Sequence, residues 1–171
     1  MNIYIIRIAA INDAEAIMKL RKKVDQEPTN KNPALDPYGG DYPTVNQQTF
    51  EIEDRVHNAI FLVAVQNEQI IGAAFCFEVY KQPHKYRLNF IVDPEWRGKG
   101  IASAMVLEVV EWAKSHSEVQ ELICGFEISH KDAKHVLEKY GFIVSKEGYS
   151  YYMQGYRYFE TEMTLSAESK S

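Results

Sequence analysis

The apolar positions of the chain change period several times, and each change marks an expected element. Residues 3–8 are apolar and β-branched, which is typical of a strand. Residues 12–26 carry apolar side chains at helical spacing, and a second, weaker helical pattern follows Asn46. Residues 27–45, between the two helices, hold four prolines and two glycines, which predicts a long loop.

From Ala59 onward strands dominate. The pattern predicts a hairpin of residues 59–65 and 69–80 around Asn67-Glu68, and then a strand over 86–93. It also predicts an amphipathic helix over 102–113, a strand over 119–128, a short helix ending at Gly141, and two strands in 142–165 around Gly148 to Gly155.

The predicted order is β-α-α-β-β-β-α-β-α-β-β. This order indicates an α/β (α+β mixed) fold, in which one central mixed sheet is flanked by helices on both faces. A length of 171 residues fits one domain, expected over 1–165, followed by a polar tail over 166–171.

Composition narrows the function classes. The chain has 24 acidic and 19 basic residues, a net charge of −5, which argues against a dedicated nucleic-acid binder. Cys76 and Cys124 lie in apolar alternating segments and predict buried free thiols, so neither a disulfide scaffold nor a cysteine-rich metal site is expected. The longest apolar runs, such as 70–77, are far shorter than the ~20 residues of a membrane span, and no leader pattern opens the chain. We therefore expect a cytoplasmic protein without a metal or a membrane partner.

The segment from Phe90 to Met105, FIVDPEWRGKGIASAM, carries the clearest chemistry. A strand ends, a glycine turn follows, and a helix begins at once, so several backbone N–H groups point to one place. That arrangement is an anion site. Two nucleotide motifs fit it poorly: Gly100 follows Lys99 where a Walker A loop needs Ser or Thr, and Ser103 stands where a dinucleotide fingerprint needs a third glycine.

A third pattern fits better. The run R-G-K-G-I-A, residues 97–102, resembles the pyrophosphate loop of the GNAT superfamily of N-acetyltransferases, and residues 130–142 resemble the second signature of that family. The resemblance covers nearly the whole chain. It implies that the parallel strands 86–93 and 119–128 splay apart and hold the pantetheine arm of acetyl-CoA between them. The cofactor-binding residues that it implies are Ile91, Val92, Arg97, Gly98, Lys99, Gly100, Ile101, Ala102 and His130.

The resemblance also implies a reaction, the direct attack of a primary amine on the thioester in a ternary complex. The tyrosine that serves the family as general acid aligns with Val136 or Leu137, which donate no proton, so Tyr140 is the nearest candidate. His130 replaces the family's asparagine, and acts as a hydrogen-bond donor, as an acid–base group, or only as an exposed histidine.

The general base is open on the sequence. Glu78 and Glu127 are the candidates, and each is alternatively an outward-facing charge on a half-solvated sheet.

The acceptor is the least specified part. The family uses the loop between its first two helices as an acceptor wall, and here that loop carries Asp36, Tyr38, Asp41 and Tyr42. Acids beside aromatics suit a cation, which favours a small-molecule amine over a protein. The aromatic stretch 149–159 lines this pocket, forms a homodimer contact, or is an ordinary β-hairpin. A non-catalytic module that binds or senses CoA is the alternative function.

Overall fold

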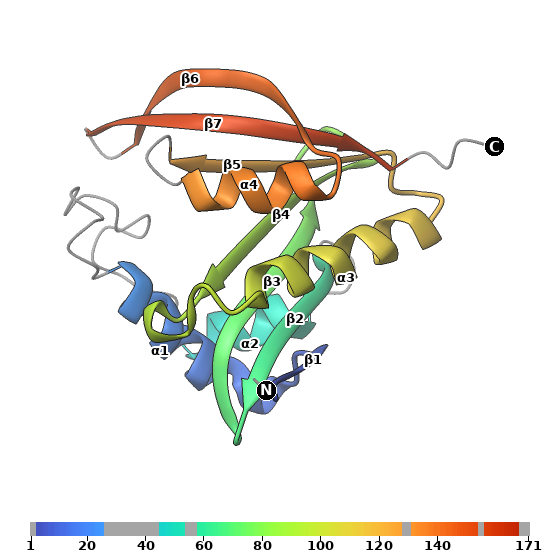
Figure 1. Cartoon of the computed structure of the whole chain (residues 1–171). Coiled ribbons are helices and arrows are strands. Elements are labelled where there is room, and N and C mark those ends of the chain that lie inside the picture. Colours follow the sequence, from blue (N-terminus) through green and yellow to red (C-terminus); the bar gives the residue numbers. More distant parts are fainter. Residues whose placement is uncertain (1–2, 26–44, 54–57, 128–130, 154–155, 168–171) are drawn as a thin grey trace.

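The computed structural model describes residues 3–25, 45–53, 58–127, 131–153 and 156–167. Its element order confirms the predicted one (Figure 1). The elements are β1 (Ile5–Ile8), the 3₁₀ turn η1 (Ile11–Asp13), α1 (Ala14–Asp25), α2 (Val45–Glu53), β2 (Asn58–Gln66), β3 (Gln69–Glu78), β4 (Lys85–Val92), the 3₁₀ turn η2 (Pro94–Trp96), α3 (Ile101–Ser115), β5 (Glu121–Glu127), α4 (Lys131–Lys139), β6 (Ile143–Met153) and β7 (Tyr156–Ser166).

The strands form one mixed sheet in the order β1-β2-β3-β4-β5-β7-β6. Neighbouring strands are antiparallel except β4 and β5, which are parallel and are joined by α3. The predicted hairpin turn is present, and Asn67 and Glu68 both have positive φ. Positive φ at both central residues matches the turn type whose twist suits a two-residue hairpin.

The parallel pair β4–β5 separates along its length. The two strands pair only from Lys85 with Glu121 to Arg87 with Ile123. Beyond that point β4 stays paired with β3, and β5 stays paired with β7. The remaining residues of the two strands therefore diverge, which confirms the expected splayed sheet.

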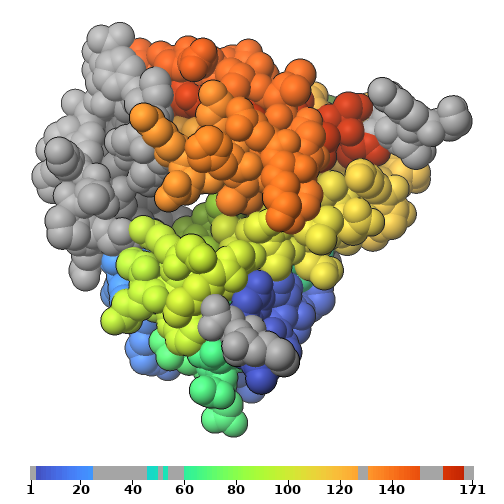
Figure 2. Space-filling view, in the orientation of Figure 1, coloured from blue at the N-terminus to red at the C-terminus, as the bar shows by residue number. Residues whose placement is uncertain are grey.

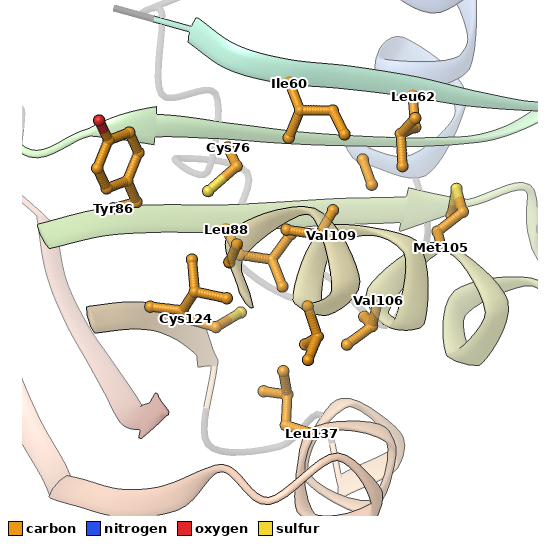
Figure 3. Packing of buried hydrophobic residues seen from close by; sticks show 14 of the residues in the cluster. Ile60, Leu62, Cys76, Tyr86, Leu88, Met105, Val106, Val109, Cys124 and Leu137 are labelled. Carbon is orange, nitrogen blue, oxygen red and sulfur yellow. The ribbon is translucent and has the colours of Figure 1, made fainter. Parts of the chain in front are cut away.

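Helices cover both faces of the sheet (Figure 1). Helices α3 and α4 lie on one face, where Met105, Val109 and Leu137 pack with Leu88 and Cys124 (Figure 3). Helices α1 and α2 cover the other face of β2 and β3 through a second apolar cluster. Burial of this much apolar surface on both faces is the main force that holds the layers together.

The two cysteines, Cys76 and Cys124, are buried and free, as predicted. Burial raises the pKa of both thiols, that of Cys124 to about 12. Neither thiol is therefore a ready nucleophile near neutral pH.

Two local predictions need correction. Gly148 lies inside β6, where the register with β7 shifts, so the expected turn starting there is a bulge. Strand β7 runs to Ser166, and the buried Ala167 donates to the carbonyl of Gln120 at 2.8 Å, so the polar tail does not begin at residue 166.

Within the described ranges, no helix has the length and apolar character needed to cross a membrane.

Candidate functional site

The turn between β4 and α3 leaves the amides of a helix start open. Asp93 begins it, and its carboxylate accepts the backbone N–H of Glu95 at 3.0 Å. Gly98 and Gly100 have left-handed backbone angles, with φ of +74° and +79°. Gly100 is the N-cap of α3 and brings no side chain to the first-turn N–H groups. Those donors stand at the positive end of the helix dipole, where an anion is stabilised.

Three basic side chains border this turn. Arg97 donates through Nε to the carbonyl that ends β4, at 3.3 Å. The Nζ atom of Lys99 lies 4.2 Å from the ring centroid of Trp96. Lys139, at the end of α4, donates to Oγ of Ser103 in the first turn of α3, at 3.0 Å. The turn thus combines backbone donors with positive charge, which suits a pyrophosphate group.

Tyr140, the predicted acid, belongs to this same neighbourhood. Its hydroxyl lies 2.7 Å from Oγ of Ser103. The structure therefore places Tyr140 beside the turn between β4 and α3, which we call the anion turn. The contact joins the end of α4 to the start of α3. Ser103 and Lys139 lie in the two motif segments, residues 90–105 and 130–142, but the sequence does not show that they meet, because they are 36 residues apart.

The part of β4 that is separated from β5 leads directly into this turn. Ile91 and Val92, the predicted neighbours of the cofactor arm, pair with Ala73 and Gly72 of β3. Their other edge lies beyond the last β4–β5 pair. Figure 2 shows a hollow on this side of the molecule, between α4 in orange and the turn before α3 in yellow-green.

Glu78, the predicted base, is not brought to this place. It pairs with Tyr86 at the opposite end of the β3–β4 hairpin, six residues along β3 from Gly72. At about 3.4 Å per residue, this puts it roughly 20 Å from the end of β4. Its carboxylate accepts the backbone N–H of His84 at 3.0 Å and so stabilises the loop between the strands.

Other predicted residues lie outside the described ranges: His130 and the acceptor-loop residues Asp36, Tyr38, Asp41 and Tyr42. The backbone of Glu127, the second candidate base, ends β5 and pairs with Glu160 of β7. In the described part of the chain, no group of three His, Cys, Asp or Glu side chains is arranged to hold a metal ion.

A lysine from α1 is anchored at the start of the anion turn. Lys23 Nζ contacts both carboxylate oxygens of Asp93 at 2.8 Å and Oε2 of Glu95 at 2.7 Å. The Asp93 side chain is only 3% exposed. Hydrogen bonds to Asp93 and then to Glu95 raise the pKa of Lys23. The ammonium thus neutralises two carboxylates that would otherwise repel an anion in the turn.

A splayed parallel strand pair that leads into an open glycine turn at a helix start defines the acyl-CoA-dependent acetyltransferase class of fold. The chain belongs to the acetyltransferase (GNAT) family, whose family model matches residues 27–142.

Curated relatives agree with this assignment. N-alpha-acetyltransferase 30 of Xenopus laevis is 28% identical over 105 residues, which are 58% of this chain and 38% of that protein. The Homo sapiens protein of the same name is 27% identical over 105 residues, again 58% of this chain but 29% of that protein. The match therefore spans well under half the length of these relatives.

Solved structures agree on the fold. An N-acetyltransferase from Staphylococcus aureus Mu50 superimposes with a TM-score of 0.80 at 21% identity, over 98% of this chain and 100% of that chain. The yncA protein of Salmonella typhimurium, solved with its cofactor acetyl-CoA, gives 0.78 at 17% identity, over 99% and 97%.

Proposed function

We propose that this protein transfers the acetyl group of acetyl-CoA to a primary amine by direct attack in a ternary complex. The observation that carries the proposal is the loss of β4–β5 pairing after Arg87 and Ile123, directly beside the open start of α3. Acetyl-CoA would supply an activated thioester, and the residues present fit its two parts: an anionic head and an extended arm.

The donor side follows from the turn and from β4. The N–H groups of residues 98–102 would hold the pyrophosphate, and Arg97, Lys99 and Lys139 would add positive charge. The arm would lie along the free edge of Ile91 and Val92. A backbone N–H near Val92 is the proposed donor to the carbonyl oxygen as negative charge develops on it.

For the acceptor, the proposal names the reacting group, an amine, and the kind of molecule that carries it. The net charge of −5 and the acidic, aromatic composition of residues 36–42 favour a cationic small molecule. A protein N-terminus is the competing acceptor, because the curated relatives carry the name N-alpha-acetyltransferase. His130 is proposed to bind the pantetheine arm of acetyl-CoA, as the family resemblance implies.

One observation favours a non-catalytic module that binds CoA: the carboxylate of Glu78, the predicted base, is engaged in a loop at the far end of β3. The hydroxyl of Tyr140, the predicted acid, is engaged with Ser103. A thiolate leaves without a dedicated acid because its conjugate thiol has a pKa of about 8–9. The hydrogen bond between Tyr140 and Ser103 therefore does not by itself favour the module over the enzyme.

Two measurements test these proposals. Calorimetric titration should show acetyl-CoA binding without comparable binding of ATP or NAD. Thiol release from acetyl-CoA should then depend on an added amine, screened with spermidine, phosphinothricin and a peptide that begins with alanine. These amines match the names of three acetyltransferases with the same fold. Acetyl-CoA binding without amine-dependent release would favour the module, and no binding would overturn both proposals.

A further inference from the structure

The open part of the sheet has a second face, opposite α3 and α4. Leu88 and Val92 of β4 point into the α3 core, whereas Ile91 packs with α1. Arg87 and Asn89 therefore share the α1 face, because side chains alternate along a strand. On β5 the same alternation puts Gly125 on the α1 face, since Cys124 is in the α3 core. Asn89 and Gly125 each lie two residues past the last β4–β5 pair.

Gly125 is where side chains from three other strands converge. A Cβ atom at this position would lie 2.9 Å from Oε2 of Glu160, 3.0 Å from Nη1 of Arg87 and 3.5 Å from the hydroxyl of Tyr149. The first two distances are shorter than an ordinary carbon contact, so a side chain at this position would push the ends of the Glu160 and Arg87 side chains aside. The carboxylate of Glu160 consequently lies directly over β5, where β5 parts from β4.

Tyr149 holds this carboxylate in place. Its hydroxyl donates to Oε2 of Glu160 at 2.8 Å, from β6 to β7 (Figure 1). Burial, and next the hydrogen bond to Glu160, raise the pKa of Tyr149, so the hydroxyl remains a donor at neutral pH. Both residues are half-buried, so neither is fully shielded from solvent.

Glu162, the other acid on this face, is placed differently. It is 6% exposed and lies 3.6 Å from Nη2 of Arg87 and 4.0 Å from Nζ of Lys146. Ser145 also donates to its carboxylate, at 3.3 Å. Glu162 thus belongs to a buried ion network with Arg87 and Lys146. Glu160 lies over Gly125, and Nη1 of the same Arg87 comes within 3.0 Å of that Gly125 position.

We propose that Glu160 binds the ammonium group of the acceptor and takes up its proton. This inference rests on the proposed acetyl transfer and names the substrate class, a cationic primary amine. The ammonium nitrogen gives one proton to the Glu160 carboxylate, and its lone pair then forms the bond to the acetyl carbon. The carbon–sulfur bond breaks, the second amine proton goes to the leaving thiolate, and Glu160 returns its proton to water. Tyr149 is a positioning residue that orients the carboxylate.

The test compares two small amines with the variant Glu160→Gln. n-Butylamine is the cationic probe, because an alkyl amine with a pKa near 10 is protonated at pH 7. Methoxyamine is uncharged at pH 7 and needs no ammonium site. We expect Glu160→Gln to lower kcat/KM for n-butylamine by roughly 100-fold, as loss of a general base does. Turnover of methoxyamine and affinity for acetyl-CoA should stay close to wild type.

Two further variants complete the test. Glu147→Gln changes an exposed acid on β6 and should leave both amines unaffected. Tyr149→Phe keeps the carboxylate but removes its donor, and should lower n-butylamine turnover by about 3–10-fold, a typical effect of one lost hydrogen bond.

Several outcomes would overturn the inference while the proposed function stands. They are unchanged n-butylamine turnover in Glu160→Gln, an equal loss for both amines, or a wild-type chain that binds acetyl-CoA and turns over methoxyamine but not n-butylamine. Failure of the wild type to bind acetyl-CoA would instead overturn the proposed function.

Discussion

The two ends of the splayed strand pair β4–β5 differ in the chemical groups that they present. At the end proposed for the phosphates, the phosphate end, the proposed ligand groups are backbone amides of one contiguous turn, surrounded by exposed cations such as Lys99 and Lys139. At the end proposed for the acceptor, the acceptor end, they are individual side chains, Glu160 and Tyr149, which are half-buried and are brought together over Gly125 by separate strands.

This difference has consequences for robustness. Most side-chain substitutions leave the backbone amides in place, so ligand binding at the phosphate end should be lost only when the turn itself or its charge is changed. Binding at the acceptor end should be lost when any one of a few side chains is changed. The first end suits a ligand common to a whole family, and the second suits an acceptor that varies among its members.

The largest effect is expected from Gly100→Asp. Aspartate tolerates left-handed backbone angles better than most residues do, but it adds a negative charge among the amides. Two like charges about 4 Å apart near a protein surface cost about 4 kcal/mol. Calorimetry should therefore show acetyl-CoA affinity falling by at least about 100-fold.

Gly100→Asn is the matched control. Asparagine adopts the same backbone angles without charge. Among the described residues, only the hydroxyl of Tyr4 lies near a Cβ there, at 4.0 Å. Its affinity should stay within about 5-fold of wild type, less than 1 kcal/mol. An equal loss in both variants would show that shape rather than charge governs this end.

The second effect concerns Lys23. Lys23→Met removes the ammonium from the buried Asp93, which costs about 1–3 kcal/mol when a buried polar partner is lost. For a chain of this size the melting temperature should fall by roughly 2–10 °C. The Kd for acetyl-CoA should also rise, because two carboxylates at the start of the turn lose their counterion.

Lys19→Met on the same helix provides the comparison. Within the described part of the chain Lys19 pairs with Glu15, and both side chains are more than 60% exposed. Such pairs contribute little, so the melting temperature and acetyl-CoA affinity should barely change. If the two lysine variants behaved alike, the link from α1 to the anion turn would be an ordinary surface contact.

The two ends also differ in how far sequence predicts them. Residues 97–102 carry their own signal, because the turn, its glycines and the helix start are contiguous, and the period of the apolar positions locates the strand before them. The order of elements is predictable for the same reason.

The acceptor end has no such local signal. Gly125 and Glu160 become neighbours only through the β5–β7 register, and Tyr149 joins them only through a shifted β6–β7 register. Glu78 is a candidate base by residue type, but only the β3–β4 register shows that it lies at the far end. Alternation predicts which face a residue takes, and it does not predict the position along the neighbouring strand.

A smaller effect is expected at the edge of the phosphate end. Lys139→Ala removes one exposed cation from the turn and should weaken acetyl-CoA binding by about 3–10-fold at low salt. The loss should shrink as ionic strength rises. Lys114→Ala, about 20 Å away at the other end of α3, should have no effect. A loss for Lys139→Ala that did not depend on salt would indicate packing rather than charge.

The smallest effect tests the acceptor end through stability alone. Because burial and the hydrogen bond to Glu160 raise the pKa of Tyr149, the unfolded chain loses this proton first as pH rises through about 10. The stability that the buried hydroxyl contributes is complete below that pH and is lost above it. Urea unfolding should therefore show the difference between wild type and Tyr149→Phe shrinking from pH 9 to pH 11. Tyr80→Phe, at an 82% exposed position, should show a constant difference. A Tyr149→Phe difference independent of pH would mean that this hydroxyl is as solvated as the cations of the phosphate end, and the contrast between the two ends would fail.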